Sequence, residues 1–295
     1  MRVFMTGASG WIGSAVIPEL LSAGHQVTGL ARSDASAAAI AALGADAFRG
    51  SLDDPSGLRD VVATSDGVIH LGYNHDFSQM QAAADTDRGV VEAIGSVLKG
   101  SDRPFVVAGG VIGIAPGRMA TENDQPDPGL HPRTANVDYV LSLANDGVRS
   151  SCVRFAPTVH GEGDHGFIAT LVAIARERGT SGYVGDGSNC WPAVHRADAA
   201  RLVRLALEGA PAGSSLHAVA ESGIPTKAIA QAIGTGLGLP IVAVARDDAA
   251  EHFGWMGRFF GANATASNTM TRELLGWNPT HQGLLEDLAA GFYFR

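Results

Sequence analysis

The chain has 295 residues and a formal net charge of −9, and its 21 lysines and arginines are scattered, so the basic surface of a nucleic-acid-binding protein is missing. Two cysteines cannot build a thiolate metal site or a disulfide framework, and no apolar run approaches the ~20 residues that a membrane span needs. We therefore expect a cytoplasmic protein that acts on a small molecule, without a metal, nucleic-acid or membrane partner.

The first half of the chain alternates short apolar segments with stretches of helical spacing. Residues 2–6 predict a buried strand, a glycine turn follows, and residues 12–22 carry apolar side chains at the spacing of a helix. Further strands are expected over residues 26–30, 67–71, 105–108 and 151–155. Strands that alternate with helices indicate an α/β fold, with a doubly wound parallel sheet of the Rossmann type.

Glycine-rich stretches after about residue 160 indicate a smaller lobe in the C-terminal part of the chain. We assign residues 1–160 to a nucleotide-binding domain, to which residues 193–220 return. Residues 161–192 and 221–295 are assigned to a smaller substrate-binding lobe.

Three glycines at intervals of three residues lie in the segment TGASGWIG, between the first strand and the following helix. Glycine permits a tight turn, lets backbone N–H groups approach a pyrophosphate, and allows close packing of helix on strand, while the helix N-terminus favours the negative charge. Because the motif follows a strand and opens a helix, it predicts a dinucleotide site. The loop residues expected to contact the dinucleotide are Gly7, Ser9, Gly10, Trp11, Ile12 and Gly13.

The end of the second strand indicates which dinucleotide binds. An NAD site would place Asp or Glu there to hold the ribose 2′-hydroxyl, whereas this chain has Ala31, Arg32 and Ser33. Arg32 can form a charge-assisted hydrogen bond with a 2′-phosphate, and Ser33 can add a second donor. We therefore predict NADP(H) as the cofactor; the alternative is that Arg32 is an ordinary solvated surface residue.

These motifs are similar to those of the short-chain dehydrogenase/reductase superfamily, in particular its extended and atypical members of the NAD-dependent epimerase/dehydratase type. TGASGWIG resembles the family's TGxxGxxG, AVHRADAARL resembles the segment that returns the chain from the substrate lobe, and ELLGWNP resembles the C-terminal LGWxP signature. The resemblance spans most of the chain and implies the fold and a nucleotide cofactor. It is much less specific for the reaction.

The resemblance also implies further contacts with the cofactor. GSLDD resembles a motif that meets the adenine, VIHLG one beside the ribose, and RFAPTVHG one near the nicotinamide carboxamide. The corresponding residues are Leu52 and Asp53, Leu71 and Gly72, and Pro157, Thr158 and Val159.

The catalytic residues of this superfamily are not found at the matching positions. Reduction of a ketone needs a proton for the developing alkoxide, which the family takes from a Tyr whose pKa is lowered by a Lys four residues on, with a Ser at the carbonyl oxygen. Here Tyr139 is followed four residues later by Leu143, and the Ser position reads Gly109 and Gly110. The usual distance from that serine would put the tyrosine at about residues 133–136, slightly before Tyr139.

Tyr139 has two open interpretations. The apolar residues of its helix form one stripe, and Tyr139 projects from roughly the opposite side. It is therefore either a catalytic residue or an exposed tyrosine with no part in the chemistry.

Polar side chains directly follow the VIHLG strand, in the segment YNHDF. Loops at the carboxyl ends of parallel strands line the crevice where ligands bind. Tyr73 or His75 can donate a proton there, with His the side chain best matched to neutral pH, and Asn74 is a candidate substrate contact. The alternative is a helix-entry loop with ordinary hydrogen bonds. The acidic residues that follow, including Asp85 and Asp87, are interpreted as solvated helix charges.

Two residues of the second half are candidate substrate contacts. His165 in GEGDHGF and Trp191 in NCWPAVH lie in stretches expected to face the substrate from the smaller lobe. Trp191 would offer a large flat apolar contact, and core packing is the competing interpretation. The histidines show no recognised metal-ligand spacing, so no metal is predicted.

The leading hypothesis is an NADP(H)-dependent oxidoreductase that acts on a carbonyl or an activated double bond of a small organic molecule, without the usual Tyr-xxx-Lys pair. The alternative is a non-redox isomerase or lyase that keeps the nucleotide, or an NADP-binding regulatory protein. A homodimer is a further expectation, because related folds often pair through helices that flank the sheet.

Overall fold

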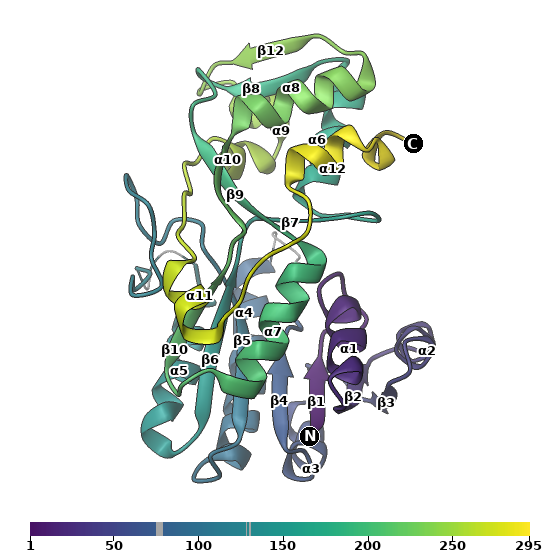
Figure 1. Cartoon of the computed structure of the whole chain (residues 1–295), viewed down its shortest axis with the longest axis vertical. Helices are drawn as coiled ribbons and strands as arrows, with labels where there is room; N and C mark the ends of the chain where they lie inside the picture. Colours follow the sequence, from purple (N-terminus) through teal and green to yellow (C-terminus); the bar gives the residue numbers. More distant parts are fainter. Residues whose placement is uncertain (75–78, 128, 130) are drawn as a thin grey trace.

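The computed structural model describes residues 1–74, 79–127, 129 and 131–295 (Figure 1). Within this part of the chain, seven parallel strands form a central sheet in the order β10-β6-β5-β4-β1-β2-β3. The strands are β1 (Arg2–Thr6), β2 (Gln26–Ala31), β3 (Asp46–Arg49), β4 (Gly67–His70), β5 (Pro104–Gly110), β6 (Arg149–Phe155) and β10 (Ser214–Ala218). The predicted doubly wound parallel sheet is confirmed. Its strand order reverses between β1 and β4, where sheets of this type bind ligands.

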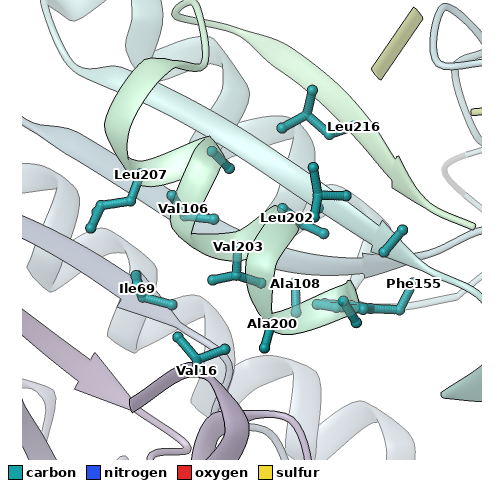
Figure 2. Close-up of a cluster of buried hydrophobic side chains, with 14 of the residues drawn as sticks. Val16, Ile69, Val106, Ala108, Phe155, Ala200, Leu202, Val203, Leu207 and Leu216 are labelled. Carbon is teal, nitrogen blue, oxygen red and sulfur yellow. The ribbon is translucent and has the colours of Figure 1, made fainter. Parts of the chain in front are cut away.

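Helices cover both faces of the sheet because its strands are apolar on both sides. On one face Met5, Ile69 and Val106 pack against α1 and α7, and Figure 2 shows Leu202 and Val203 of α7 facing this part of the sheet. On the other face Phe4, Val68 and Phe105 pack against α3, α4 and α5. The helices of this body are α1 (Gly13–Ser22), α2 (Asp34–Ala42), α3 (Arg59–Ala63), α4 (Met80–Leu98), α5 (Thr134–Ser142), α7 (Arg196–Gly209) and α11 (Thr269–Leu275), with the short 3₁₀ helices η1 (Pro55–Leu58) and η3 (Leu143–Asp146).

The smaller lobe lies beyond the carboxyl ends of the central strands (Figure 1). It contains a three-stranded sheet in the order β11-β9-β7 and a parallel pair, β12-β8. The strands are β7 (Thr158–His160), β8 (Ser181–Val184), β9 (Cys190–His195), β11 (Glu221–Pro225) and β12 (Ile241–Val244). The helices are α6 (Phe167–Arg178), α8 (Thr226–Leu237), α9 (Ala249–Phe253), α10 (Met256–Phe260) and α12 (Leu284–Ala289), followed by the 3₁₀ helix η4 (Phe292–Phe294).

The boundary between the two bodies is more interleaved than the sequence pattern indicates. The sequence assigns all of residues 221–295 to the smaller lobe, yet α11 lies beside β10 in the main body (Figure 1). Ala266 and Trp277, which flank α11, are buried in the same core as α1 and α7. The C-terminal part of the chain therefore crosses from the lobe to the sheet and back.

Among the described residues, no helix has both the length and the apolar composition that crossing a membrane requires.

Candidate functional site

The glycine loop after β1 is wedged between the end of β4 and the start of α1. Gly7 has a left-handed φ of +68°, and a Cβ added to it would lie 2.6 Å from the backbone nitrogen of Gly72. A Cβ added to Gly13 would lie 2.0 Å from the carbonyl oxygen of Gly7. Only glycine fits at these two positions. The loop thereby brings the N-terminus of α1 to the carboxyl edge of the sheet, which is the arrangement that binds a pyrophosphate.

Trp11 joins this loop to the smaller lobe. Its indole Nε1–H donates a 2.7 Å hydrogen bond to the carbonyl oxygen of Val159. The guanidinium of Arg196 stacks over the indole ring at 4.1 Å, and the His165 ring meets it edge-on with centroids 5.6 Å apart. The structure thus brings together Trp11, Val159 and His165, which the sequence proposes as cofactor and substrate contacts.

The tip of β2 carries an exposed Arg32 beside an exposed Ser33. Ser33 caps α2, because its hydroxyl accepts a 3.2 Å hydrogen bond from the backbone N–H of Ser36. The next carboxylate along the chain, on Asp34, lies 3.2 Å from Arg49. Among the ion pairs of the described residues none involves Arg32, whereas Arg49 on the neighbouring strand β3 is paired with Asp34.

The other expected cofactor residues line the edge of the sheet near the switch point. A Cβ added to Gly72 would lie 3.2 Å from Leu52 Cδ1, so these two residues are neighbours, and the Leu71 N–H donates to the Thr6 carbonyl at 3.3 Å. Asp53 is exposed and accepts a 2.9 Å hydrogen bond from the Ser51 hydroxyl. The remaining residues of the set are the exposed Ser9 and Gly10, the partly buried Ile12 and Pro157, and the buried Thr158.

Tyr139 lies away from this edge. Its hydroxyl approaches Gly95 of α4, at 3.2 Å from the position of an added Cβ, and the Arg88 guanidinium stacks over its ring at 4.3 Å. Gly95 belongs to the last turn of α4, which packs near the amino ends of the strands. The structure therefore places Tyr139 in the contact between α4 and α5 rather than in the cofactor crevice.

Arg133 lies at the position where the sequence spacing expects the family's tyrosine. It is the N-cap residue of α5, and its guanidinium stacks over the half-buried ring of Tyr73 at 4.3 Å. The pKa of the Tyr73 phenol is raised, chiefly by burial and to a lesser extent by the Asp87 charge, while the charge of Arg133 opposes that rise. A phenol and a permanent cation therefore meet beside the carboxyl end of β4, with the cation at the place expected for the tyrosine and the phenol on the loop after β4.

A buried carboxylate holds Arg133 in place. Asp87 of α4 is 3% exposed, and its Oδ1 lies 3.3 Å from Arg133 Nε and 3.1 Å from His70 Nε2. Its Oδ2 accepts a 2.8 Å hydrogen bond from Asn136 Nδ2. His70 Nδ1 lies 2.7 Å from the hydroxyl of Thr6, the residue before the glycine loop. This chain of polar contacts links the glycine loop to the start of α5.

Asp87 is a correction to the sequence interpretation, which treats it as a solvated helix charge. Burial on its own raises the pKa of this carboxyl, but the Arg133 charge and the hydrogen bonds from His70 and Asn136 outweigh it and hold the pKa at about 2. The signal was present in the sequence, because Asp87 shares helical spacing with the buried Val91 and Ile94.

The remaining candidate residues have different outcomes. Asn74 is exposed at the end of the described part of the β4 loop, and His75 lies outside the described residues. Trp191 is fully buried in the core of the smaller lobe, where its Nε1–H donates a 3.1 Å hydrogen bond to the Phe259 carbonyl. Core packing, the competing interpretation, therefore describes Trp191, because the flat apolar face expected for the substrate is covered by protein.

A second polar cluster, partly buried, lies at the base of the smaller lobe. His160 Nδ1 is 2.6 Å from the Asp287 carboxylate, and the His195 ring is stacked on that of His281 with centroids 4.6 Å apart. His281 Nδ1 lies 3.0 Å from Asp198. Across the described ranges, no three His, Cys, Asp or Glu side chains are arranged to hold a metal ion.

Comparison with known proteins places these features in a family context. The model of the NAD dependent epimerase/dehydratase family matches residues 3–219. The chain is 46% identical over 296 residues to uncharacterized protein C2A9.02 of Schizosaccharomyces pombe, with 100% of both chains covered. It is 27% identical over 228 residues to 2-alkyl-3-oxoalkanoate reductase of Stenotrophomonas maltophilia, which covers 73% of this chain and 68% of the relative.

Solved structures share the fold at low sequence identity. UDP-glucose 4-epimerase from Thermotoga maritima superposes with a TM-score of 0.78, covers 100% of this chain and 98% of its own, and is 18% identical. That structure contains UDP-glucose. At this identity the likeness concerns the fold alone.

Proposed function

Because this chain belongs to the NAD-dependent epimerase/dehydratase family, we propose that it is an NADP(H)-dependent oxidoreductase acting on a carbonyl or an activated double bond of a small, partly apolar molecule. The reductase among its relatives supports a reaction of this type. The observation that carries the proposal is the exposed Arg32 at the tip of β2, where an NAD-binding chain of this fold needs a carboxylate.

The residues present fit a bound dinucleotide phosphate. Gly7 and Gly13 form a loop that no larger residue can adopt, and the N-terminus of α1 favours the pyrophosphate. Arg32 would hold the 2′-phosphate by charge-assisted hydrogen bonds, since the Ser33 hydroxyl is already engaged in capping α2. The reduced nicotinamide, when bound, would supply hydride chemistry.

Replacement of Arg32 by alanine tests the cofactor assignment. Hydrogen bonds to charged groups contribute roughly 1.5–3 kcal/mol, so Arg32→Ala should weaken NADPH binding at least about tenfold and leave NADH binding nearly unchanged. Fluorescence titration with each nucleotide measures both affinities. Arg59→Ala is the matched control, because Arg59 is an arginine at the start of α3 that hydrogen-bonds Ser96 of α4. Equal losses for NADPH and NADH in Arg32→Ala would rule out the assignment.

Isotope transfer tests the redox reaction. The protein is incubated with NADPH deuterated at nicotinamide C4, in each stereochemical form separately, and with a pooled set of ketones, aldehydes and enones. Deuterium is expected in one product and from only one of the two forms, as measured by mass spectrometry. Saturable NADPH binding without deuterium in any product would count against net reduction.

A non-redox role is the second candidate: an isomerase or lyase that keeps the nucleotide, or an NADP-binding regulatory protein. The catalytic positions favour it, because Tyr139 is followed four residues later by Leu143 rather than by a lysine, and Gly109 and Gly110 replace the serine. A Cβ added to Gly110 would meet nothing within 4 Å. A Cβ added to Gly109 would instead lie 2.8 Å from Cys152 Sγ, so a side chain fits at Gly110 but not at Gly109. Interconversion of a substrate with no change in NADPH concentration would support this candidate.

A further inference from the structure

The position of Tyr73 is determined by the ends of two neighbouring strands, β4 and β1. It follows β4 by three residues, and the backbone nitrogen of its neighbour Gly72 donates a 3.0 Å hydrogen bond to the Thr6 hydroxyl at the end of β1. The same nitrogen is where an added Cβ on Gly7 would collide. Tyr73 therefore begins from backbone that is fixed against the glycine loop, at the switch point of the sheet.

Arg133 reaches this place from a different part of the chain. Its side chain is 16% exposed and covers one face of the Tyr73 ring, with 4.3 Å between the guanidinium and the ring centroid. A guanidinium stays charged at every pH that a folded protein tolerates. A fixed cation next to a phenol stabilises the phenolate form relative to the phenol.

The ion pair with Asp87 restricts the position of the Arg133 guanidinium. Asp87 holds Arg133 Nε, while His70 and Asn136 occupy the other positions on the same carboxylate. If Thr6 accepts from Gly72, its own proton can go to His70 Nδ1, which leaves His70 Nε2–H to donate to Asp87. Donation then runs from Gly72 through Thr6 and His70 to the Asp87 carboxylate, which also accepts from Asn136 and faces the Arg133 guanidinium.

We propose that Tyr73 is the proton donor of this protein and that Arg133, held by Asp87, is the positioning residue that stabilises its phenolate. This inference rests on the proposed oxidoreductase function. It assigns the two roles of the missing Tyr-xxx-Lys pair to residues on the β4 loop and at the start of α5, which local sequence spacing does not connect.

The proton and electron balance of the step is simple. A bound reduced nicotinamide would supply the hydride of the new C–H bond, so the substrate would gain two electrons and the cofactor would lose two. The C=O double bond becomes a single bond as its oxygen takes the proton of the Tyr73 O–H. Tyr73 is left as a phenolate beside Arg133 and recovers a proton from water.

Titration of the phenol tests the pair without any substrate. The chain contains four tyrosines, so ¹³Cζ-labelled tyrosine gives few NMR signals, and Tyr73→Phe identifies the one from Tyr73. In Arg133→Met the pKa read from that signal should be higher than in the unmodified protein by about one pH unit or more. In Arg133→Lys the positive charge is kept, so the pKa should be closer to that of the unmodified protein. Identical titration curves in the unmodified protein and in Arg133→Met would overturn the proposal.

Turnover tests the role of the phenol. With the compound that accepts most deuterium from labelled NADPH, Tyr73→Phe should lower kcat by roughly 10²- to 10⁴-fold while the Kd for NADPH changes less than about threefold. Tyr183→Phe is the matched control, since Tyr183 lies on β8 in the smaller lobe, and it should keep full turnover. Unchanged kcat in Tyr73→Phe would also overturn the proposal.

The two proposals fail in different ways. If no compound accepts deuterium, the oxidoreductase function fails, and the titration still decides whether Arg133 controls the Tyr73 phenol. If deuterium is transferred at full rate by Tyr73→Phe, the function stands and the assignment of the proton donor falls.

Discussion

The carboxylate of Asp87 connects more of the candidate site than any single cofactor-loop residue does. It contacts Arg133 beside Tyr73, Asn136 in the first turn of α5, and His70 at the end of β4. Burial of an unpaired charge is costly, so each of these contacts is also a condition for the fold. Asp87 therefore both positions residues of the candidate site and contributes to the stability of the fold.

Neutralising Asp87 should destabilise the fold. Asp87→Asn leaves Arg133 as a cation without its buried partner, and loss of one member of a buried ion pair costs about 3–5 kcal/mol. Chemical denaturation measures the free energy of unfolding. Asp85→Asn is the control, because Asp85 is exposed on the same helix, and it should change that free energy by less than about 0.5 kcal/mol. Equal effects of the two substitutions would contradict the buried network.

The same carboxylate predicts a dependence of stability on acid pH. Its pKa is lowered from 3.8 to about 2 in the folded protein, so the folded state binds this proton less readily than the unfolded state does. The ionised Asp87 carboxyl therefore contributes about 2 kcal/mol to the free energy of unfolding. This contribution is complete above about pH 4 and is lost as the pH falls toward 2. In Asp87→Asn the loss of stability between pH 4 and pH 2 should be smaller by that amount, as measured by denaturation at each pH. A slope identical to that of the unmodified protein would contradict the assignment.

At the scale of elements, the turn from β1 into α1 brings the N-terminus of α1 to the carboxyl edge of the sheet, where we expect the cofactor to bind. Gly7 needs its left-handed φ and Gly13 needs the space of a missing side chain, so strand, loop and helix can meet only with glycine at both positions. The sequence motif anticipated this geometry because the constraint is local and repeats at a fixed spacing.

Addition of one methyl group to that turn should remove cofactor binding. In Gly13→Ala the new Cβ would meet the Gly7 carbonyl oxygen at 2.0 Å, so the loop must move away from α1. We expect NADPH affinity to fall at least about a hundredfold, equivalent to roughly 2.7 kcal/mol, in a fluorescence titration. Gly209→Ala serves as control, since its Cβ would make an ordinary 3.9 Å contact near the end of α7. Retained affinity in Gly13→Ala would show that the loop does not hold the pyrophosphate.

At the scale of the whole molecule, the C-terminal segment fastens the smaller lobe to the sheet. It leaves the lobe to place α11 beside β10, and Trp277 is then buried with its Nε1–H donating a 3.0 Å hydrogen bond to the Asp198 carbonyl on α7. The Asp198 carboxylate accepts hydrogen bonds from the backbone N–H groups of Thr280 and His281 at 3.0 and 2.9 Å. These hydrogen bonds hold the segment that leads from α11 back to the smaller lobe.

Truncation of Trp277 should loosen this attachment. Trp277→Ala removes a fully buried aromatic side chain, which costs about 3–5 kcal/mol in the free energy of unfolding. Denaturation followed by far-ultraviolet circular dichroism measures that energy. The matched change is Trp255→Ala in the smaller lobe, where the side chain is 47% exposed, and a clearly smaller loss is expected. If Trp255→Ala cost as much as Trp277→Ala, the segment around α11 would not be the stabilising contact.

The sequence by itself determined the parallel sheet, the glycine loop and the place of Arg32, because each depends on periodicity or spacing within a short segment. Tertiary structure decided the rest. Several contacts join segments that are far apart in the chain: Tyr73 with Arg133, Asp87 with its partners, Tyr139 between α4 and α5, and α11 with the sheet. Helical spacing places Asp87 on the buried face of its helix, but it does not identify the groups that pair with the carboxylate. Such contacts depend on which faces pack together, and that is a property of the folded chain.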